Sequence, residues 1–180
     1  YVFLDARRAS SINGILGVQP DPETGRVRVT GDLDPRLRNA LRRGEAIDLN
    51  WRSLADKTQD LKLRLNLPFV FNTPFGADMA LKMFKRDTTF LEVNARGALE
   101  YLLQRGDKVL GFVNSKSSDR LGRTTTALPG LADVSILSYG LGVVRERFDY
   151  RYNPRQGMAL NVEGSAGNKR SSTAVIGSGD

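Results

Sequence analysis

Hydrophobic and polar residues alternate in the stretch of residues 59–71, which reads QDLKLRLNLPFVF, and the alternation is strict from Leu61 to Leu67. Leucine occupies every odd position from 61 to 67, and the positions between are Lys62, Arg64 and Asn66. Successive side chains of a β-strand point to opposite faces, whereas a helix would spread these charges around its circumference. The pattern therefore predicts a strand with one apolar face and one charged face.

A second alternating stretch covers residues 90–103. One face would carry Leu91, Val93, Ala95, Gly97, Leu99 and Tyr101, and the other Glu92, Asn94, Arg96, Ala98 and Glu100. Strands of globular proteins usually have about 5–6 residues, whereas a tilted strand that crosses a bilayer needs about 9–11. Two long alternating runs raise the question of whether the apolar face meets a protein core or lipid.

Further alternating runs occupy most of the remaining chain. Strands are expected over residues 11–18, 26–34, 46–54, 77–86, 108–118, 134–152 and from 158 onward. Polar segments rich in Pro, Gly, Asn or Asp separate these runs, and the longest of them covers residues 119–133. The sequence thus predicts an all-β fold, an antiparallel up-and-down meander of about nine strands.

Residues 35–44 (PRLRNALRRG) fit two structures. Proline in a first turn and glycine just past the end are helix signals. Alternatively, the preceding strand continues through Leu37 to a tight turn at residues 42–45. We favour the strand and turn, because clear alternation restarts immediately afterwards at Ala46.

The composition limits the available chemistry. The 180 residues include no cysteine and no histidine, which excludes disulfides and removes the commonest metal ligand and general base. No clustered acidic motif suggests a carboxylate metal site, so we expect neither enzyme activity nor a cofactor or metal. No apolar run is long enough to form a transmembrane helix.

The net charge of +7 fits nucleic acid, lipid headgroups, an acidic partner or simply a solvated polar face. One basic cluster consists of Arg36, Arg38, Arg42 and Arg43, and it would bind lipid phosphates or an accessory protein, or form a solvated turn. Because basic and aromatic residues do not share one face, we expect no nucleic-acid partner.

Aromatic residues gather near alternate turns of the predicted meander, which lie at one end of the sheet. This aromatic belt comprises Phe69, Phe71, Phe75, Tyr101, Phe148, Tyr150 and Tyr152. Short turns beside an aromatic belt at one end and longer polar loops at the other are typical of an outer-membrane β-barrel.

We therefore interpret the sheet as part of a transmembrane β-barrel. The expected lipid-facing residues are Leu61, Leu63, Leu65, Leu67, Leu91, Val93 and Leu99, and the expected lumen-facing residues are Lys62, Arg64, Glu92, Arg96 and Glu100. The alternative is a soluble β-barrel that binds a ligand and directs its apolar face inward.

Three stretches carry a family resemblance: residues 37–53 (LRNALRRGEAIDLNWRS), 59–81 (QDLKLRLNLPFVFNTPFGADMAL) and 85–103 (KRDTTFLEVNARGALEYLL). They resemble the barrel region of the BamA/TamA-type outer-membrane assembly factors. In that family, N-x-x-x-R-G-E and N-x-P-F/L-x-G turns join early barrel strands on the periplasmic side. The corresponding residues here are Arg43, Gly44, Glu45, Asn72, Pro74 and Gly76.

The resemblance implies a protein of the outer membrane that folds and inserts other barrel proteins through a lateral gate beside its first strand. Here that strand would be Ser11, Ile12, Asn13, Gly14, Ile15, Leu16, Gly17 and Val18. The implied partners are outer-membrane lipid and lipopolysaccharide, unfolded outer-membrane client proteins and accessory lipoproteins. A passive porin or secretion pore is the alternative within the same architecture.

The chain departs from the family pattern in having no recognisable POTRA domain and no V-R-G-F/Y motif, and in ending in Gly-Ser-Gly-Asp. We therefore expect the N-terminal part of a barrel over residues 11–170. Residues 1–10 are a candidate for the end of a preceding periplasmic domain, and residues 171–180 form a tail without an assignment.

Overall fold

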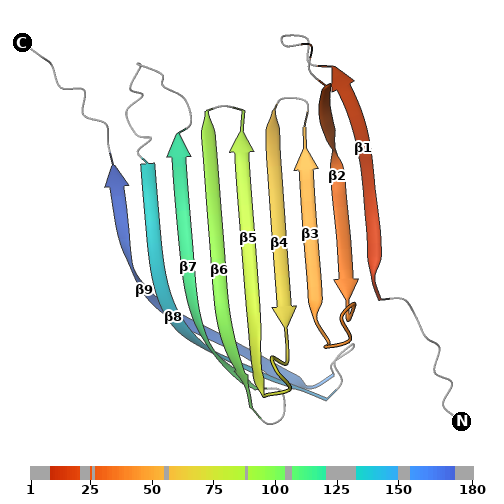
Figure 1. Cartoon of the computed structure of the whole chain (residues 1–180). Helices are drawn as coiled ribbons and strands as arrows, with labels where there is room; N and C mark the ends of the chain where they lie inside the picture. Colours follow the sequence, from red (N-terminus) through yellow and green to blue (C-terminus); the bar gives the residue numbers. More distant parts are fainter. Residues whose placement is uncertain are drawn as a thin grey trace, which may run out of the picture.

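The computed structural model describes residues 9–20, 25, 27–54, 57–87, 89–103, 107–120, 133–149 and 155–172. These residues form one antiparallel sheet of nine strands and no helix (Figure 1). The strands are β1 (Ser11–Pro20), β2 (Val27–Arg38), β3 (Ala46–Ser53), β4 (Thr58–Leu67), β5 (Phe75–Arg86), β6 (Phe90–Leu102), β7 (Lys108–Arg120), β8 (Asp133–Phe148) and β9 (Gly157–Ser172).

Each strand pairs with its neighbours in the chain, in the order β1 to β9. The predicted up-and-down meander of nine strands is therefore confirmed. The longest strands, β8 and β9, each have 16 residues, well beyond the usual length in globular proteins. β9 ends at Ser172, two residues inside the segment that the sequence left without an assignment.

The structure decides two local questions, the alternatives for residues 35–44 and the length of the strand expected over residues 59–71. β2 continues to Arg38 and is followed by a turn, so the helix alternative for residues 35–44 is wrong. The expectation that one strand runs from residue 59 to 71 is also wrong, because β4 ends at Leu67. Phe71 and Asn72 have left-handed φ angles of 53° and 58°, which break the extended backbone and form the turn to β5.

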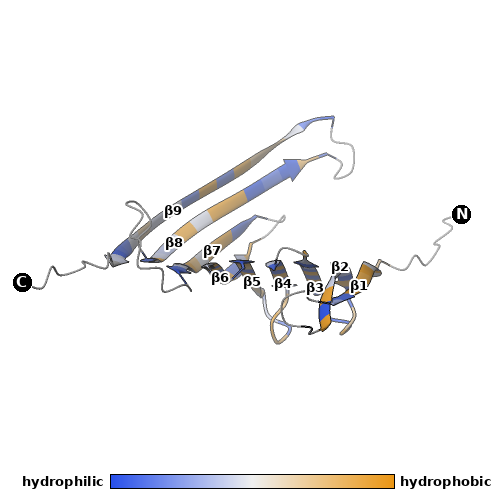
Figure 2. Ribbon diagram, turned by 90° about the horizontal axis from the view of Figure 1, so that it is seen from above, coloured by the Kyte–Doolittle hydropathy of each residue, from blue (hydrophilic) through white to orange (hydrophobic). Residues whose placement is uncertain are grey.

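The pairing register divides the side chains between two faces. Leu63 lies opposite Leu49 of β3 and Leu81 of β5, while Lys62 lies opposite Asn50 and Lys82. The sheet is curved, and β8 and β9 bend out of the plane of the other strands (Figure 2). The lysine side lines a hollow and is therefore the concave face, so the leucine side is the convex face.

Few apolar side chains are buried in the described part of the chain. Ala98, Leu110 and Phe112 form a small cluster on the concave face, with Val144 packed against it. Many large apolar side chains of the convex face are exposed instead, among them Leu99 (68%) and Leu141 (72%). This sheet therefore has no conventional hydrophobic core along its apolar face.

Candidate functional site

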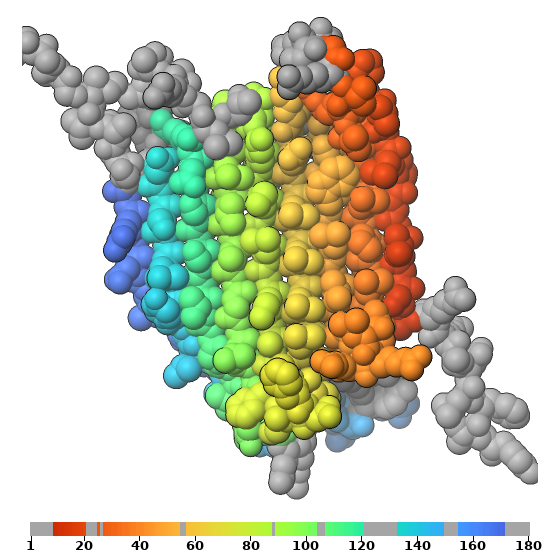
Figure 3. Space-filling view, viewed as in Figure 1, coloured from red at the N-terminus to blue at the C-terminus, as the bar shows by residue number. Residues whose placement is uncertain are grey.

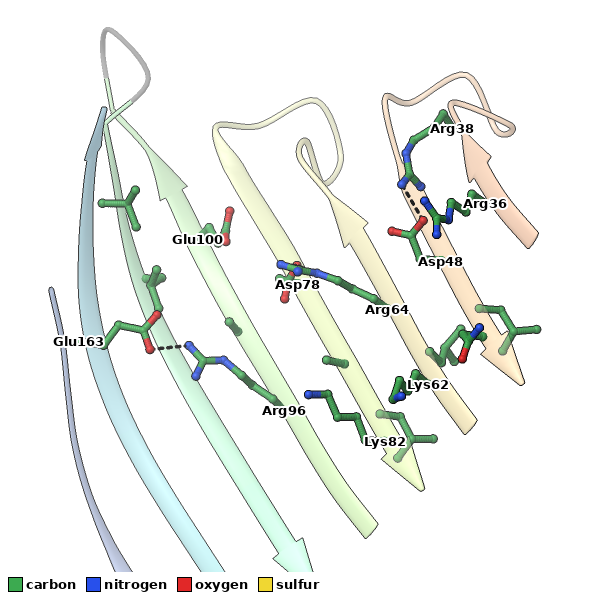
Figure 4. Close-up of a pocket in the computed structure, with 18 of the residues that line it drawn as sticks. Arg36, Arg38, Asp48, Lys62, Arg64, Asp78, Lys82, Arg96, Glu100 and Glu163 are labelled. Carbon is green, nitrogen blue, oxygen red and sulfur yellow. Dashed lines mark hydrogen bonds and ion pairs between the residues drawn. The ribbon is translucent and has the colours of Figure 1, made fainter. Parts of the chain in front are cut away.

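Charged side chains line the hollow of the concave face, which has a volume of about 680 Å³ (Figure 4). Alternation places them there, because each strand from β2 to β6 has charged residues at every second or fourth position. All five residues that the sequence assigned to a lumen, Lys62, Arg64, Glu92, Arg96 and Glu100, lie on this face by register.

Many charged side chains of the concave face form ion pairs with a residue of an adjacent strand, while Arg36–Asp34 and Lys62–Asp60 pair within one strand. Arg38 of β2 contacts Asp48 of β3 at 2.6 Å, and Arg64 of β4 contacts Asp78 of β5 at 3.2 Å. Further pairs are Arg52–Asp32, Lys108–Glu100 and Lys116–Glu92. Exposed pairs contribute only about 0.2–1 kcal/mol each. Their main consequence is a polar, hydrated surface with its charges largely balanced.

Among the described ion pairs of the concave face, the pair of Arg96 with Glu163 joins two strands that are not neighbours. The guanidinium of Arg96 lies 3.9 Å from the centre of the Phe112 ring on β7, and its Nη2 atom donates to Glu163 Oε2 on β9 at 2.9 Å. This contact passes over β7 and β8, which is feasible only where the sheet bends toward itself. Arg96 therefore links the middle of the sheet to its last strand.

Glycine on β8 makes room for this arrangement. A Cβ atom built at Gly140 would collide with the Phe112 ring and lie 2.5 Å from the carbonyl oxygen of Gly164. A Cβ built at Gly142 would lie 3.2 Å from Leu110 and 2.9 Å from Glu163. The two glycines thus let the large side chains of β7 lie flat against β8.

The convex face holds all of the residues that the sequence assigned to lipid. Leu61, Leu63, Leu65 and Leu67 pair across the strands with Met83, Leu81, Met79 and Ala77, and Leu91, Val93 and Leu99 share their face. Apolar side chains continue on β7, β8 and β9, as with Val113, Tyr139 and Val162. This apolar surface follows the full width of the described sheet.

The first strand forms a free edge. All ten residues of β1 pair with β2, from Ser11 opposite Arg36 to Pro20 opposite Val27. No strand of the described part pairs with the other edge of β1. The eight residues that the sequence assigned to a lateral gate all belong to this strand. Gly14 permits a close approach to β2, since a Cβ there would collide with Leu33.

The turn between β2 and β3 is built around a single carboxylate. Glu45 is 1% exposed and accepts hydrogen bonds from the backbone N–H groups of Leu41 and of Arg43, the latter at 3.0 Å. The Leu41 hydrogen bond is the main reason that the pKa of Glu45 lies below its ordinary value, and burial opposes it. Asn39 completes the turn by accepting from the Gly44 N–H at 2.8 Å.

The predicted periplasmic turn residues lie at one end of the sheet. Arg43, Gly44 and Glu45 belong to the β2–β3 turn, and Asn72 and Pro74 belong to the β4–β5 turn. Gly76 lies inside β5, where it is buried and its missing Cβ would be 3.1 Å from the Leu67 carbonyl oxygen.

The predicted aromatic belt falls into four groups. Phe75 and Tyr101 face each other across β5 and β6, with ring centres 5.1 Å apart, and Phe69 and Phe71 lie in the β4–β5 turn. Phe148 ends β8 with the alternation of the concave face. Tyr150 and Tyr152 lie outside the described residues.

Sequence reasoning did not identify Phe112, Gly140 or Glu163. The available signal was the spacing of Gly140 and Gly142, two positions on one face of a strand, which indicates a neighbour that needs the space. Identifying that neighbour requires the register between β7 and β8.

No group of three or more His, Cys, Asp or Glu residues among the described ones is arranged to hold a metal ion. The described residues include no helix with the length and apolarity needed to cross a membrane. Comparison of the chain with protein-family models, curated proteins and solved structures finds no match.

Proposed function

We propose that this chain is part of a transmembrane β-barrel of a bacterial outer membrane, and that it inserts other barrel proteins through the free edge of β1. In this proposal the convex face contacts lipid and the concave face lines a hydrated lumen. The clients are unfolded outer-membrane proteins, and accessory lipoproteins are further partners.

The separation of the two faces carries the proposal. Large side chains such as Met79, Leu99 and Leu141 are at least half exposed on the convex face, while charged residues pair on the concave face. A soluble barrel would have the reverse arrangement. Covering one large apolar side chain contributes about 1.5–3 kcal/mol, so an apolar face of this width needs a non-aqueous environment.

Strand length supports the same assignment. β5, β6 and β7 have 12, 13 and 13 residues, which is sufficient for a tilted strand to cross the hydrocarbon layer. A strand within hydrocarbon must satisfy its backbone groups by pairing. Pairing on both sides meets this requirement along most of β4 to β7, whereas the β2–β3 ladder is interrupted at Asp34 and Pro35.

The edge of β1 supports the insertion role. Its outward N–H and C=O groups form a template that an incoming strand can extend by β-augmentation. Gly14 and Gly17 contribute no side chain of their own to the contact of β1 with β2, where Leu33 lies against Gly14 and Thr30 against Gly17. A regular edge that can be extended by hydrogen bonding suits the temporary binding of client strands.

Disulfide crosslinking tests the insertion role. Since the chain has no cysteine, single cysteines at positions 11–18 report on β1 alone. We expect them to crosslink in register to a cysteine in the terminal strand of a client stalled during assembly. A cysteine replacing Leu81, in the middle of the sheet, is the control and should not react.

Crosslinks from β1 only to lipid probes or to the protein's own turns would overturn the insertion role. Steady ion conductance together with that result would instead indicate a passive pore. Such a pore would share the charged concave face but make no use of the β1 edge.

A further inference from the structure

The turns β2–β3 (residues 39–45) and β4–β5 (residues 68–74) lie side by side at one end of the convex face, and we refer to them as the paired turns (Figure 3). They are in contact, because a Cβ built at Gly44 would lie 3.3 Å from Cγ of Pro68. The two turns thus form one surface, although the residues at their centres are about thirty positions apart in the sequence.

The β4–β5 turn presents an aromatic side chain in a strained conformation. Phe71 is 88% exposed and has a left-handed φ of 53°. A bulky residue in this region costs about 1–3 kcal/mol and persists only when the surroundings impose it. Here Val70 N–H donates to the Phe75 carbonyl oxygen at 2.7 Å, and Thr73 Oγ1 donates to the Val70 carbonyl oxygen at 2.5 Å.

The turn alone would be satisfied by glycine or asparagine at position 71. The structure places phenylalanine there, with the apolar side chains of Phe69 and Leu41 also exposed nearby in the paired turns. These exposed groups continue the apolar surface of the convex face beyond the end of the strands, where Phe75 and Tyr101 form their ring contact.

The β2–β3 turn adds positive charge to the same surface. Arg42 and Arg43 are exposed, and neither takes part in the described ion pairs, although the charge of Arg43 helps to lower the pKa of Glu45. The one carboxylate of this turn, Glu45, is buried and turned inward to the backbone N–H groups. The surface is therefore cationic next to its aromatic tip.

We propose that the paired turns bind anionic phospholipid, with Phe69 and Phe71 in the boundary between headgroups and acyl chains and Arg42 and Arg43 on the phosphates. Aromatic rings are favoured at this depth, and each arginine near an anionic surface contributes attraction. This inference rests on the proposed membrane location. It adds a specific lipid site at the periplasmic rim.

Quenching of tryptophan fluorescence by brominated lipid tests the site. Trp51 is the only tryptophan, so the double variant W51F/F71W reports on position 71 alone. The membrane-embedded protein is placed in bilayers where a minor fraction of brominated phosphatidylglycerol is mixed into unlabelled phosphatidylcholine. In the matched bilayer, the bromine is on phosphatidylcholine at the same mole fraction.

We expect several-fold stronger quenching from the anionic lipid, because about fivefold enrichment follows from one arginine near the surface. Adding R42E/R43E should remove the difference. The control K85E/R86E changes the charge equally at the opposite end of β5 and should leave the difference intact. If position 71 tolerates no tryptophan, W51F/F69W supplies a second reporter.

The outcomes separate the two proposals. Equal quenching by both lipids at positions 69 and 71 would overturn the anionic site. Absence of quenching at both positions, together with strong quenching of a tryptophan placed at Leu63, would overturn the site and leave the membrane location standing. Absence of quenching at all three positions would overturn both.

Discussion

The two halves of the sheet use charged residues differently. In β2 to β5, ion pairs join neighbouring strands, as in Arg38–Asp48 and Arg64–Asp78, and this part of the sheet is nearly flat. In β6 to β9, Lys108–Glu100 and Lys116–Glu92 also join neighbouring strands, but Arg96 in addition reaches past two strands to Glu163, and β8 and β9 bend away (Figure 2). The alternation of polar and apolar residues is common to both halves, so alternation does not determine curvature.

Glycine placement distinguishes the two halves. β8 and β9 have Gly140, Gly142, Gly164 and Gly167 in their interiors, whereas β3 and β4 have no glycine. Missing side chains allow β8 to approach the Phe112 ring and let the strands bend. The comparison indicates that alternation defines which face is polar, and that between β7 and β9 the glycines opposite large side chains lie where the sheet curves.

The largest expected effect comes from filling the space beside Phe112. In G140A, the new methyl group would collide with that ring and with the backbone oxygen of Gly164, which cannot move without disturbing β9. We expect a loss of about 1–3 kcal/mol in the free energy of unfolding in lipid or detergent. Urea titration followed by the mobility of folded and unfolded protein in gels measures this loss.

The matched control is G97A, on the convex face of β6. A Cβ at position 97 meets no atom within 4 Å. Alanine there should be neutral or slightly stabilising, because it reduces the entropy of the unfolded chain. If G140A and G97A unfold at the same urea concentration, the account of curvature in β6 to β9 is wrong.

A smaller effect is expected in the flat half, at the β2–β3 turn. The pKa of Glu45 is lowered in the folded protein from its ordinary value of 4.5, chiefly by the Leu41 N–H. Such a carboxylate contributes stability that is fully present above the ordinary pKa and is lost as the pH falls through the folded pKa. E45Q should therefore be less stable than the parent protein at neutral pH.

The difference between E45Q and the parent should shrink as the pH falls below 4.5, and unfolding midpoints measured at several pH values would show it. E146Q, which replaces an exposed carboxylate on β8, is the control and should follow the parent. A gap between E45Q and the parent that is independent of pH would contradict the role given to the Glu45 carboxylate.

Much of the fold follows from the sequence because a period of two residues is a local signal. The strands around Leu63 and Glu92 were predicted by counting alternate positions, and the register confirms their faces. The end of β4 was not predicted, because residues 68–71 (PFVF) continue the apolar character of the strand without a polar break. Pro68 and the left-handed φ angle of Phe71 end the strand. No sequence pattern indicates that a phenylalanine will adopt a left-handed φ angle.

The contacts of the concave face could be predicted only in part. The sequence indicates that Arg96 lies on the polar face, but not that its partner is Glu163, 67 positions away. That contact depends on the curvature of the whole sheet, which results from many small strand rotations. For the same reason, the contact between the paired turns required the register of four strands.

The central claim is that the convex face contacts lipid and the concave face contacts water. Spin labels along β4 test it most directly. Single cysteines at positions 61–67 are labelled one at a time in the membrane-embedded protein, and collisions with oxygen and with a water-soluble nickel chelate are compared. We expect labels at Leu61, Leu63, Leu65 and Leu67 to collide with oxygen, and labels at Lys62, Arg64 and Asn66 to collide with the chelate. The account would be contradicted if neither reagent reached the labels at the odd positions. It would also be contradicted if the chelate reached the odd positions and not the even ones.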